Sequence, residues 1–296
     1  MKKATTISLI AVSALFLLSV SACGSSSNSN ATSSGSGNNS SAGSSSSAAA
    51  SAVKLIHPGK LTICTNPPFA PFETLQGTKF TGLDIDVMDN VAKALGVTVA
   101  PINTPFEQIE SGVALTANNC DILASALSIT TSRASKYNFS YPYFNNVLGV
   151  LTKEPSITDV ASLKGKKIVV QRVTTGANWV KAKGLPYVET PDLGTQIQGL
   201  KSGQTDVAIN DDIVLEPYAT DGYRIAFIIP DNGQYGYGVS KSNPALLQVV
   251  NTTLRTMTSD GTMASLYKKY SIPADSLVAY DTSGNPVITT LNPDAE

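Results

Sequence analysis

The sequence predicts an α/β protein of two lobes, each a mainly parallel sheet with flanking helices, joined by a hinge of two strands. Short β-rich runs alternate with amphipathic segments from Leu61 onward, which is typical of βαβ units. This alternation restarts near Lys166, as expected if a second lobe is inserted into the first. About 240 of the 296 residues follow the amino-terminal region, more than one typical core contains.

Residues 1–22 have the features of an export signal. Lys2 and Lys3 precede the apolar stretch Ile7–Val20, which is shorter than the ~20 residues a membrane span needs. The following Val20-Ser21-Ala22-Cys23-Gly24 resembles a bacterial lipobox, in which Cys23 becomes the lipidated first residue. The alternative is an ordinary signal peptide with an incidental cysteine.

Residues 23–52 are expected to form a lipid-attached, disordered linker. From Gly24 to Ala52 the chain is almost entirely Ser, Gly, Asn and Ala, which offers too little apolar surface to order it. Such a coil has a root-mean-square reach of roughly 30 Å, suitable for a tether. Without Lys2 and Lys3 the chain has 19 basic and 22 acidic residues and no basic run, so nucleic-acid binding is not indicated.

The first lobe is predicted over 53–145 and 238–270. Asp84 is expected to cap a helix that ends at Gly96, and Asn243-Pro244 to start a long helix near the end of the fold. The other elements predicted here are strands at Leu61–Thr65, Val97–Val99 and Asp121–Ala124, and a helix at Phe106–Ala117.

The second lobe is predicted over 146–237, with crossings near Tyr143–Val147 and Tyr235–Val239 and a carboxyl-terminal extension at 271–296. Its strands are expected at Lys166–Gln171 and Asp206–Ile209. One helix is expected to open at Thr174-Thr175-Gly176 and carry Trp179, and another to run from a cap at Asp192 to Gly203.

Ligands of such sheets bind beyond the carboxyl ends of the strands. The segments at those ends are Asn66–Phe72, Ala126–Arg133, Gln171–Gly176 and Asn210–Asp212. Arg133 offers a planar fork for a carboxylate, helped by the Ser128 hydroxyl. The amides of Thr175 and Gly176 open a helix, which favours an anion. Asp211 suits an ammonium group, and Phe69 and Phe106 supply apolar walls, so the sequence predicts a pocket for a zwitterion.

Each of these residues also has an ordinary structural interpretation. Arg133 alone could pair with a surface acid, Asp211 could be a helix cap, and the two phenylalanines could belong to the core. The binding-site interpretation is favoured because all of them fall at predicted strand ends, which independent accidents would not produce.

Several motifs resemble the polar-amino-acid solute-binding proteins of ABC importers, the bacterial extracellular solute-binding proteins of family 3. The similarity extends from Leu61 to Tyr270 and keeps the family's motif order. The motifs are Thr65–Glu73, Gly82–Asp86, Ser128–Arg133, Phe139–Tyr143, Leu163–Lys167 and Asp260–Thr262. This resemblance implies the periplasmic-binding-protein fold of type II.

The resemblance also implies roles for individual residues. The carboxylate clamp is expected at Arg133, Ser128, Thr175 and Gly176, a backbone contact at Ala126, the ammonium partner at Asp211, and the ring sandwich at Phe69 and Phe106. Asn66 and Arg172 match positions that meet the distal end of the ligand, and Asn210 adjoins the ammonium partner. Because Asn66 replaces an acid found in binders of basic amino acids and Arg172 adds positive charge, we expect an amide, acidic or other polar amino acid.

The expected function is therefore capture of an amino acid by lobe closure and delivery to a membrane-embedded ABC permease. We expect a monomer without cofactor or metal, held by lipid on the outer face of the cell membrane, or on the periplasmic side in a two-membrane bacterium. One alternative is an enzyme similar to cyclohexadienyl dehydratase on the same scaffold, although the single histidine, His57, precedes the first strand and forms no Ser-His or metal-type pattern. The other is a sensor component that presents ligand to a receptor.

Two features stay open at this point. Strand geometry separates Cys64, near the end of its strand, from Cys120, before the start of its own, whereas related binding proteins often carry such a pair as a disulfide. In the extension, Val287-Ile288-Thr289 could add an edge strand or remain loose.

Overall fold

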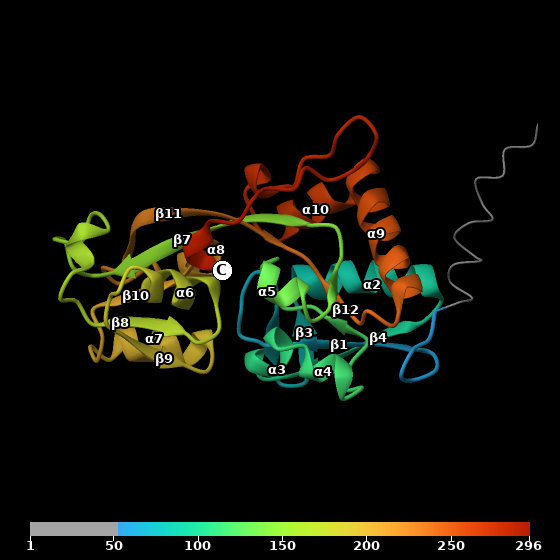
Figure 1. Cartoon of the computed structure of the whole chain (residues 1–296), viewed down its shortest axis with the longest axis horizontal. Coiled ribbons are helices and arrows are strands. Elements are labelled where there is room, and N and C mark those ends of the chain that lie inside the picture. Colours follow the sequence, from blue (N-terminus) through green and yellow to red (C-terminus); the bar gives the residue numbers. More distant parts are fainter. Residues whose placement is uncertain (1–52) are drawn as a thin grey trace, which may run out of the picture. The chain divides into compact units, whose positions relative to one another are not determined.

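The computed structural model describes residues 53–296 (Figure 1). The predicted signal peptide, Cys23 and the linker lie outside the described residues, so those expectations stay untested. Within 53–296, no helix combines the length and the apolar character that membrane crossing requires.

Lobe 1 is built on a five-stranded sheet in the order β4-β1-β5-β12-β6. Its strands are β1 (Lys60–Thr65), β4 (Thr98–Asn103), β5 (Ile122–Leu123), β6 (Asn138–Phe139) and β12 (Gly238–Val239). Its helices are α2 (Leu83–Leu95), α3 (Phe106–Glu110), α4 (Val113–Thr116), α5 (Thr131–Ala134), α9 (Pro244–Ser259) and α10 (Thr262–Lys269), and a hairpin joins β2 (Thr74–Gln76) to β3 (Lys79–Thr81). Helices α2, α9 and α10 gather on one side of the sheet and α3 and α4 on the other (Figure 1).

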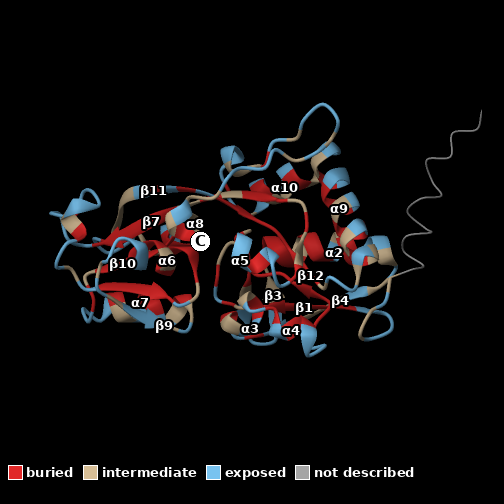
Figure 2. Cartoon of the chain, viewed as in Figure 1, coloured by how far each residue is buried: buried red, intermediate tan, exposed pale blue. Residues whose placement is uncertain are grey.

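Lobe 2 has a second five-stranded sheet in the order β11-β7-β10-β8-β9. Its strands are β7 (Phe144–Thr152), β8 (Ile168–Gln171), β9 (Tyr187–Thr190), β10 (Val207–Asp211) and β11 (Arg224–Tyr235). Its helices are α6 (Thr175–Ala182), α7 (Leu193–Lys201) and α8 (Asp212–Leu215), with 3₁₀ turns η1 (Ala161–Leu163) and η2 (Glu216–Tyr218). Figure 2 shows that the inner strands of both sheets are mostly buried and the outer helical faces exposed, whereas the edge strands β4, β6 and β9 have no buried residue.

The two-lobe α/β fold is as predicted, but the sheets are mixed rather than mainly parallel. In lobe 1, β1 is parallel to β4 and β5, whereas β12 is antiparallel to β5 and β6. In lobe 2, β8 is parallel to β9 and β10, whereas β7 is antiparallel to β10 and β11. The antiparallel strands are those adjoining the crossings, because a chain that leaves one lobe and returns must reverse direction.

Two helix predictions need correction. Asp84 is not the cap of α2; Gly82 holds that position, and the buried Asp84 side chain points into the fold instead. The helix predicted at Phe106–Ala117 is broken into α3 and α4 because Gly112 adopts a left-handed conformation with φ 73°. The capping side chains of Asp192 and Asn243 are as predicted, since each accepts a bond from an amide three residues later.

The crossings form an aromatic hinge. The chain leaves lobe 1 into β7 and returns at the end of β11, and Phe144 pairs with Tyr235 in the resulting ladder. The rings of these two residues stack with centroids 5.1 Å apart, and those of Tyr143 and Tyr237 stack at 4.4 Å. Such offset contacts stabilise the hinge beyond area burial alone.

Cys64 and Cys120 form a disulfide with a Cα–Cα distance of 5.7 Å. The strand-geometry argument that separated them was wrong, because it assumed an extended approach to β5. The chain instead enters β5 from a loop in which Asn118 has a positive φ of 55°, and Cys120 of this loop lies next to Cys64 of β1. Both cysteines lie in a small core with Phe106, Ile109 and their neighbours.

The extension beyond Tyr270 is ordered against the hinge. Val287 and Thr289 exchange hydrogen bonds with the side chain of Gln234 on β11, at 3.0 Å each. This contact runs through a side chain, so Val287-Ile288-Thr289 does not become an edge strand of the sheet. The extension ends in the 3₁₀ turn η4 (Pro293–Ala295), where Ala295 is fully buried.

Candidate ligand-binding site

A small cavity of about 10 Å³ lies where the strand ends of the two lobes face each other. Its lining from lobe 1 comprises Phe69, Phe106, Ala126, Ser128 and Arg133, and its lining from lobe 2 comprises Gln171, Thr174, Thr175 and Asp211. Such a volume holds about one water molecule, so the lobes must part to admit a ligand between them. A hollow of about 430 Å³ around Lys54, Asp121 and Ser240 belongs to lobe 1 alone, and lobe movement would not enclose a ligand there.

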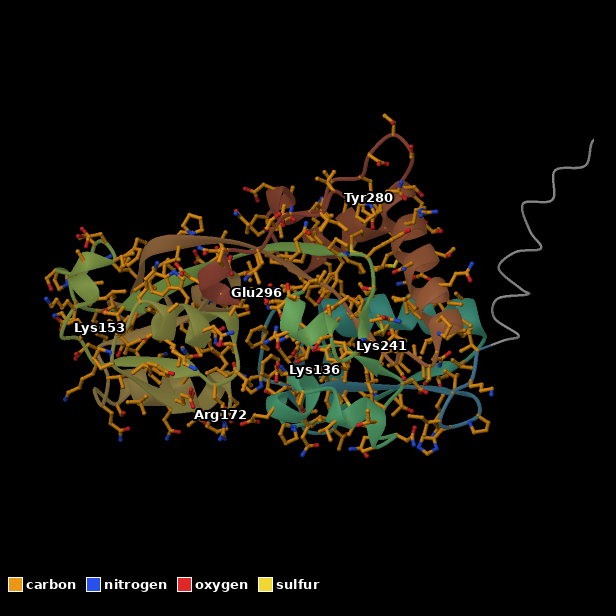
Figure 3. All side chains as sticks on the ribbon, in the orientation of Figure 1. Lys136, Lys153, Arg172, Lys241, Tyr280 and Glu296 are labelled. Atoms are coloured by element: carbon orange, nitrogen blue, oxygen red, sulfur yellow. A yellow bond between two sulfur atoms is a disulfide. The ribbon has the colours of Figure 1, made fainter. Side chains whose placement is uncertain are left out.

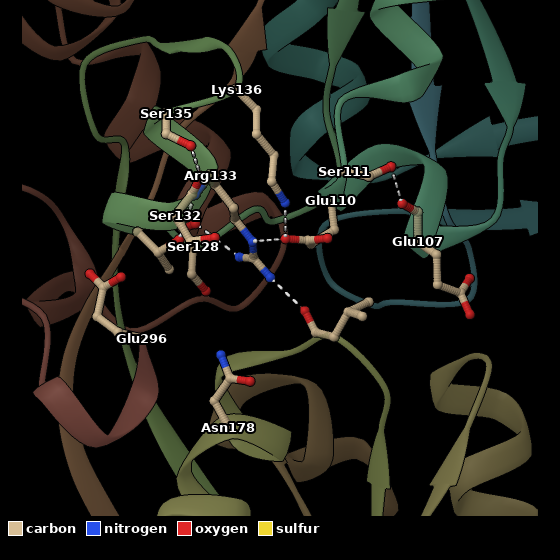
Figure 4. Close-up of polar contacts among 12 residues, drawn as sticks. Glu107, Glu110, Ser111, Ser128, Ser132, Arg133, Ser135, Lys136, Asn178 and Glu296 are labelled. Atoms are coloured by element: carbon tan, nitrogen blue, oxygen red, sulfur yellow. Dashed lines mark hydrogen bonds and ion pairs between the residues drawn. The ribbon is translucent and has the colours of Figure 1, made fainter.

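Arg133 is the buried cation of this site, with 4% of its surface exposed. Its Nη1 donates to the Ser128 carbonyl at 2.9 Å, and its Nη2 donates to the Val173 carbonyl in lobe 2 at 2.8 Å (Figure 4). The Glu110 carboxylate lies 3.8 Å from its Nε, and the guanidinium lies over the Phe106 ring at 5.7 Å. The fork is therefore fixed in orientation and presented to the cavity, as carboxylate recognition requires.

Asp211 is the buried anion of this site and ends β10. One carboxylate oxygen accepts from Asn146 Nδ2 and the other from Tyr235 Oη, both at 2.6 Å. Burial raises the pKa of Asp211 to about 6, although these two hydrogen bonds lower it. It is not the side-chain helix cap that the alternative interpretation proposed, because it makes no capping bond to α8.

The floor of the cavity at Ala126 is held from below by Asp84. Ala126 has a positive φ of 41°, and its amide donates to the Asp84 carboxylate at 2.9 Å. The same carboxylate accepts from Tyr143 Oη at 2.6 Å and Tyr237 Oη at 3.1 Å. Burial raises the pKa of Asp84 to about 6, and the Tyr143 bond lowers it. The hinge residues Tyr143 and Tyr237 and the Ala126 amide at the cavity floor thus all donate to the buried Asp84 carboxylate.

The lobe 2 side is shaped by the start of α6. Thr174 caps this helix by accepting from the Ala177 amide at 3.1 Å, which leaves the first two residues, Thr175 and Gly176, at the cavity side. The first amides of a helix have no acceptor within it and favour an anion. A Cβ on Gly176 would lie 3.3 Å from the Ile209 carbonyl oxygen, so glycine lets α6 pack closely on β10.

The structure brings seven of the eleven predicted site residues together on the cavity lining. Gly176 is next to the lining residue Thr175 but does not line the cavity itself, and three side chains lie elsewhere. Asn66 donates its Nδ2 to the Thr104 carbonyl at 2.9 Å, away from the cavity lining. Arg172 is half-exposed and forms an ion pair with Glu107 of lobe 1, because it follows the last residue of β8 and turns outward (Figure 3). Asn210 is buried and donates to Gln196 Oε1 at 2.8 Å behind the site.

Sequence reasoning missed Gln171 and Thr174 as individual lining residues, although it had selected the segment that contains them. Gln171 is 1% exposed, and its Oε1 lies 3.4 Å from Asn210 Nδ2. Its position as the last residue of β8 was the available signal, since strand ends meet the ligand in such sheets.

The arrangement pairs one buried cation with one buried anion between two aromatic side chains. Phe69 and Phe106 are each 8% exposed; Phe69 lies in the segment after β1, and Phe106 is the first residue of α3. Within 53–296 there is no group of three or more His, Cys, Asp and Glu side chains placed to hold a metal ion. The site is therefore chemically suited to holding a small zwitterion by charge and apolar contact.

Comparisons with known proteins show what this chain is similar to. The probable histidine-binding protein of Campylobacter jejuni is 27% identical over 219 residues, covering 72% of this chain and 85% of that protein. The L-cystine-binding protein TcyA of Bacillus subtilis is 29% identical over 221 residues, covering 72% of this chain and 81% of that protein. A solved structure of an ancestral arginine-binding protein bound to arginine is 31% identical, with a TM-score of 0.67 over 72% of this chain and 98% of the other.

These relatives are named as binding proteins, in agreement with the expectation that the chain is not an enzyme. The family model for bacterial extracellular solute-binding proteins, family 3, matches residues 61–273. The chain belongs to the bacterial extracellular solute-binding proteins of family 3.

Proposed function

We propose that this protein captures a polar amino acid between its lobes and delivers it to an ABC permease. The observation that carries the proposal is the position of Arg133 and Asp211 on the lining of one small cavity, each from a different lobe. An α-amino acid presents a carboxylate and an ammonium on one carbon, and these two side chains are complementary to them. Neither lobe alone has both charges at the cavity, so the ligand is held fully only when the lobes close.

The lining also bears on the ligand side chain. Asp211 is the only acid among the described residues that line the cavity, and its charge is matched to the α-ammonium. A guanidinium or a second ammonium on the ligand would then lack a partner, which is unfavourable in a buried site. We propose an amide, acidic or other polar amino acid, although the relatives include proteins named for arginine, histidine and cystine. The structure of the ancestral relative bound to glutamine is compatible with this choice, at 31% identity.

Closure follows from contacts that exist only when the lobes meet. Arg133 of lobe 1 donates to the Val173 carbonyl of lobe 2, and Arg172 of lobe 2 pairs with Glu107 of lobe 1. A ligand that contacts both lobes adds to these bonds and shifts the population toward the closed form. A micromolar complex corresponds to about −8 kcal/mol. Charge-assisted bonds of ~1.5–3 kcal/mol each can supply this, less the loss of rigid-body freedom.

We further propose that Cys23 carries lipid and that residues 24–52 tether the binding domain to the outer face of the membrane. Support comes from the sequence alone: a short apolar core, small residues before the cysteine and an uncharged Ser/Gly/Asn segment after it. We propose that the protein acts as a monomer, as capture between two lobes of one chain requires no second copy. Mass spectrometry of the amino-terminal peptide from membranes tests the anchor, and replacing Cys23 with Ser should release the protein.

A thermal-shift screen against the twenty amino acids, cystine and common polyamines tests the ligand proposal. A ligand at 100 times its dissociation constant stabilises the protein by about 2.7 kcal/mol, which raises the melting temperature measurably. The protein should first be unfolded and refolded to remove co-purified ligand. We expect a shift with an uncharged polar or acidic amino acid; a shift with arginine or lysine only would contradict the ligand class, and no shift with any amino acid would contradict the function.

A further inference from the structure

The last ten residues cross from the hinge to both lobes. They lie beyond the residues that match the family model, which end at 273. After the Gln234 contacts on β11, the Asn292 amide donates to the Asp231 carbonyl at 2.6 Å and its Nδ2 to the Pro230 carbonyl at 3.1 Å. The segment is thereby fixed to the hinge strand before it reaches the cleft.

On the lobe 2 side, the segment packs on α6. Asp294 forms an ion pair with Lys183, and the Ala295 carbonyl accepts from Asn178 Nδ2 at 3.4 Å. Ala295 itself is fully buried. Asn178 lies in α6 and Lys183 directly follows it, and α6 is the helix whose start lines the cavity.

On the lobe 1 side, the segment contacts α5. Both oxygens of the Glu296 carboxylate lie 3.0 Å from the Thr131 amide, and the Thr131 hydroxyl donates to one of them at 3.0 Å. Thr131 is two residues from Arg133 in the same short helix. Figure 4 shows the Glu296 side chain directed at helix α5. In this view Glu296 and Asn178 of α6 lie on the same side of α5.

We propose that residues 291–296 form a strap that favours the closed form and so strengthens ligand binding; this inference rests on the proposed capture by lobe closure. Its bonds to β11 and α6 are made within one rigid unit and persist when the lobes separate. The Glu296 bonds to Thr131 connect the two lobes and must break on opening. Only the Glu296 bonds to Thr131 differ between the open and closed forms, so only these bonds shift the equilibrium between the two forms.

The strap is suited to reversible release. Both Glu296 and Thr131 are exposed to solvent, so their contact is weakened by water and can break at each opening. Apparent affinity scales with the fraction of protein that is binding-competent. We expect loss of the strap to weaken amino-acid binding by about three- to tenfold. A decrease in the binding-competent fraction by the same factor produces a change of this size.

The test compares three variants with the parent protein. One ends at Thr290, which keeps the Val287 and Thr289 contacts to β11 and removes the strap. The second is Glu296→Gln, which keeps the side-chain size but removes the charge. The control is Glu189→Gln, which removes one exposed charge from the outer strand β9 and leaves the strap intact.

Small-angle X-ray scattering of ligand-free protein reports lobe opening without any ligand. We expect a larger radius of gyration for the shortened chain and for Glu296→Gln, and the parent value for Glu189→Gln. Calorimetric titration with L-glutamine then measures affinity, expected to fall only in the first two variants. Parent-like scattering of the shortened chain would overturn the strap. If L-glutamine bound neither parent nor variants, the ligand proposal would be in question while scattering alone would still decide the strap.

Discussion

Replacing Arg133 with alanine tests the centre of the proposed site. The change removes the buried guanidinium that faces the cavity and its bonds to the Ser128 and Val173 carbonyls. The fold should survive, because Glu110, the acid beside Arg133, retains Lys136 at 3.0 Å as a partner. Asp211 loses the nearby charge but keeps its hydrogen bonds from Asn146 and Tyr235, so the effect of the alanine variant should appear mainly in ligand binding.

The size of the effect follows from the bonds lost. A guanidinium fork makes two hydrogen bonds to a carboxylate, each contributing ~1.5–3 kcal/mol when charge-assisted. The ligand carboxylate keeps the amides at the start of α6 as partners, and water can enter the space, so part of this is recovered. We expect a net loss of about 2–4 kcal/mol, which is roughly 30- to 700-fold in the dissociation constant.

Calorimetric titration with the amino acid found in the screen measures this loss, and thermal melting checks the fold. Arg172→Ala is the matched control, since Arg172 also joins the lobes but has a half-exposed side chain, paired with Glu107. Exposed ion pairs contribute at most ~1 kcal/mol, so the control should weaken binding less than about fivefold. A folded Arg133→Ala variant with affinity within threefold of the parent would refute the assignment, as would equal losses in the two variants.

Three further changes test other parts of the structure. Reducing the bond between Cys64 and Cys120, 56 residues apart, should lower the free energy of unfolding by about 4 kcal/mol on the chain-entropy model; denaturant titration with and without reductant measures it, and equal midpoints would contradict the bond. Gln171→Glu places a second acid on the cavity lining and should raise the affinity for arginine relative to glutamine in a competition assay; an unchanged preference would contradict its position. Asp192→Ala removes the acceptor of the Thr195 amide at 2.7 Å and should destabilise lobe 2 by ~1 kcal/mol without changing ligand affinity, as melting and titration would show.

The sequence was sufficient to predict the two-lobe fold and the edge at which the site lies. Hydrophobic periodicity located β1, β8 and β10 within two residues, and the rule on strand ends then selected the segments that line the cavity. Local signals such as the caps at Asp192 and Asn243 were also reliable, because they depend only on neighbouring residues.

Features that depend on long-range packing could not be predicted in the same way. Asp84 has the sequence position of a cap, but the Ala126 amide and two tyrosine hydroxyls from the hinge supply it with partners in the interior. Arg172 directly follows β8 and its half-exposed side chain pairs with Glu107, whereas Arg133 lies in α5 and its side chain is buried. The disulfide was left open because it depends on the path of the loop before β5, which no periodic pattern marks.

The pH dependence of binding tests Asp211 separately from Arg133. Burial raises its pKa to about 6 in the ligand-free protein; Tyr235 and Asn146 lower it, Asp212 raises it and the Arg133 charge lowers it. An α-ammonium attracts only the ionised form, so binding should lower this pKa and release a proton. Affinity is then nearly constant above about pH 7 and falls about fivefold between pH 6 and pH 5.

Stability of the ligand-free protein should move in the opposite direction. Because the folded pKa lies above the unfolded value of about 3.9, the folded state binds more protons between these values. The stabilising contribution of Asp211 is therefore complete below about pH 4 and is lost as the pH rises through about 6. The melting temperatures of the ligand-free and ligand-bound protein should thus diverge as the pH increases. Ionisation of Asp211 lowers the stability of the ligand-free protein and strengthens ligand binding.

Titration in buffers of different ionisation heats, at pH 5, 6 and 7.5, counts the protons released on binding. Asp211→Asn should bind weakly at all three values with no proton release. Asp212→Asn removes a charge that raises the pKa of Asp211, so it should keep the fall in affinity but move it to lower pH. Equal affinity of the parent protein at pH 5 and pH 7.5 would show that Asp211 does not hold the ammonium group. Because Arg133 stays charged throughout this range, a loss of affinity at pH 5 that disappears in Asp211→Asn can only come from the anion of the pair.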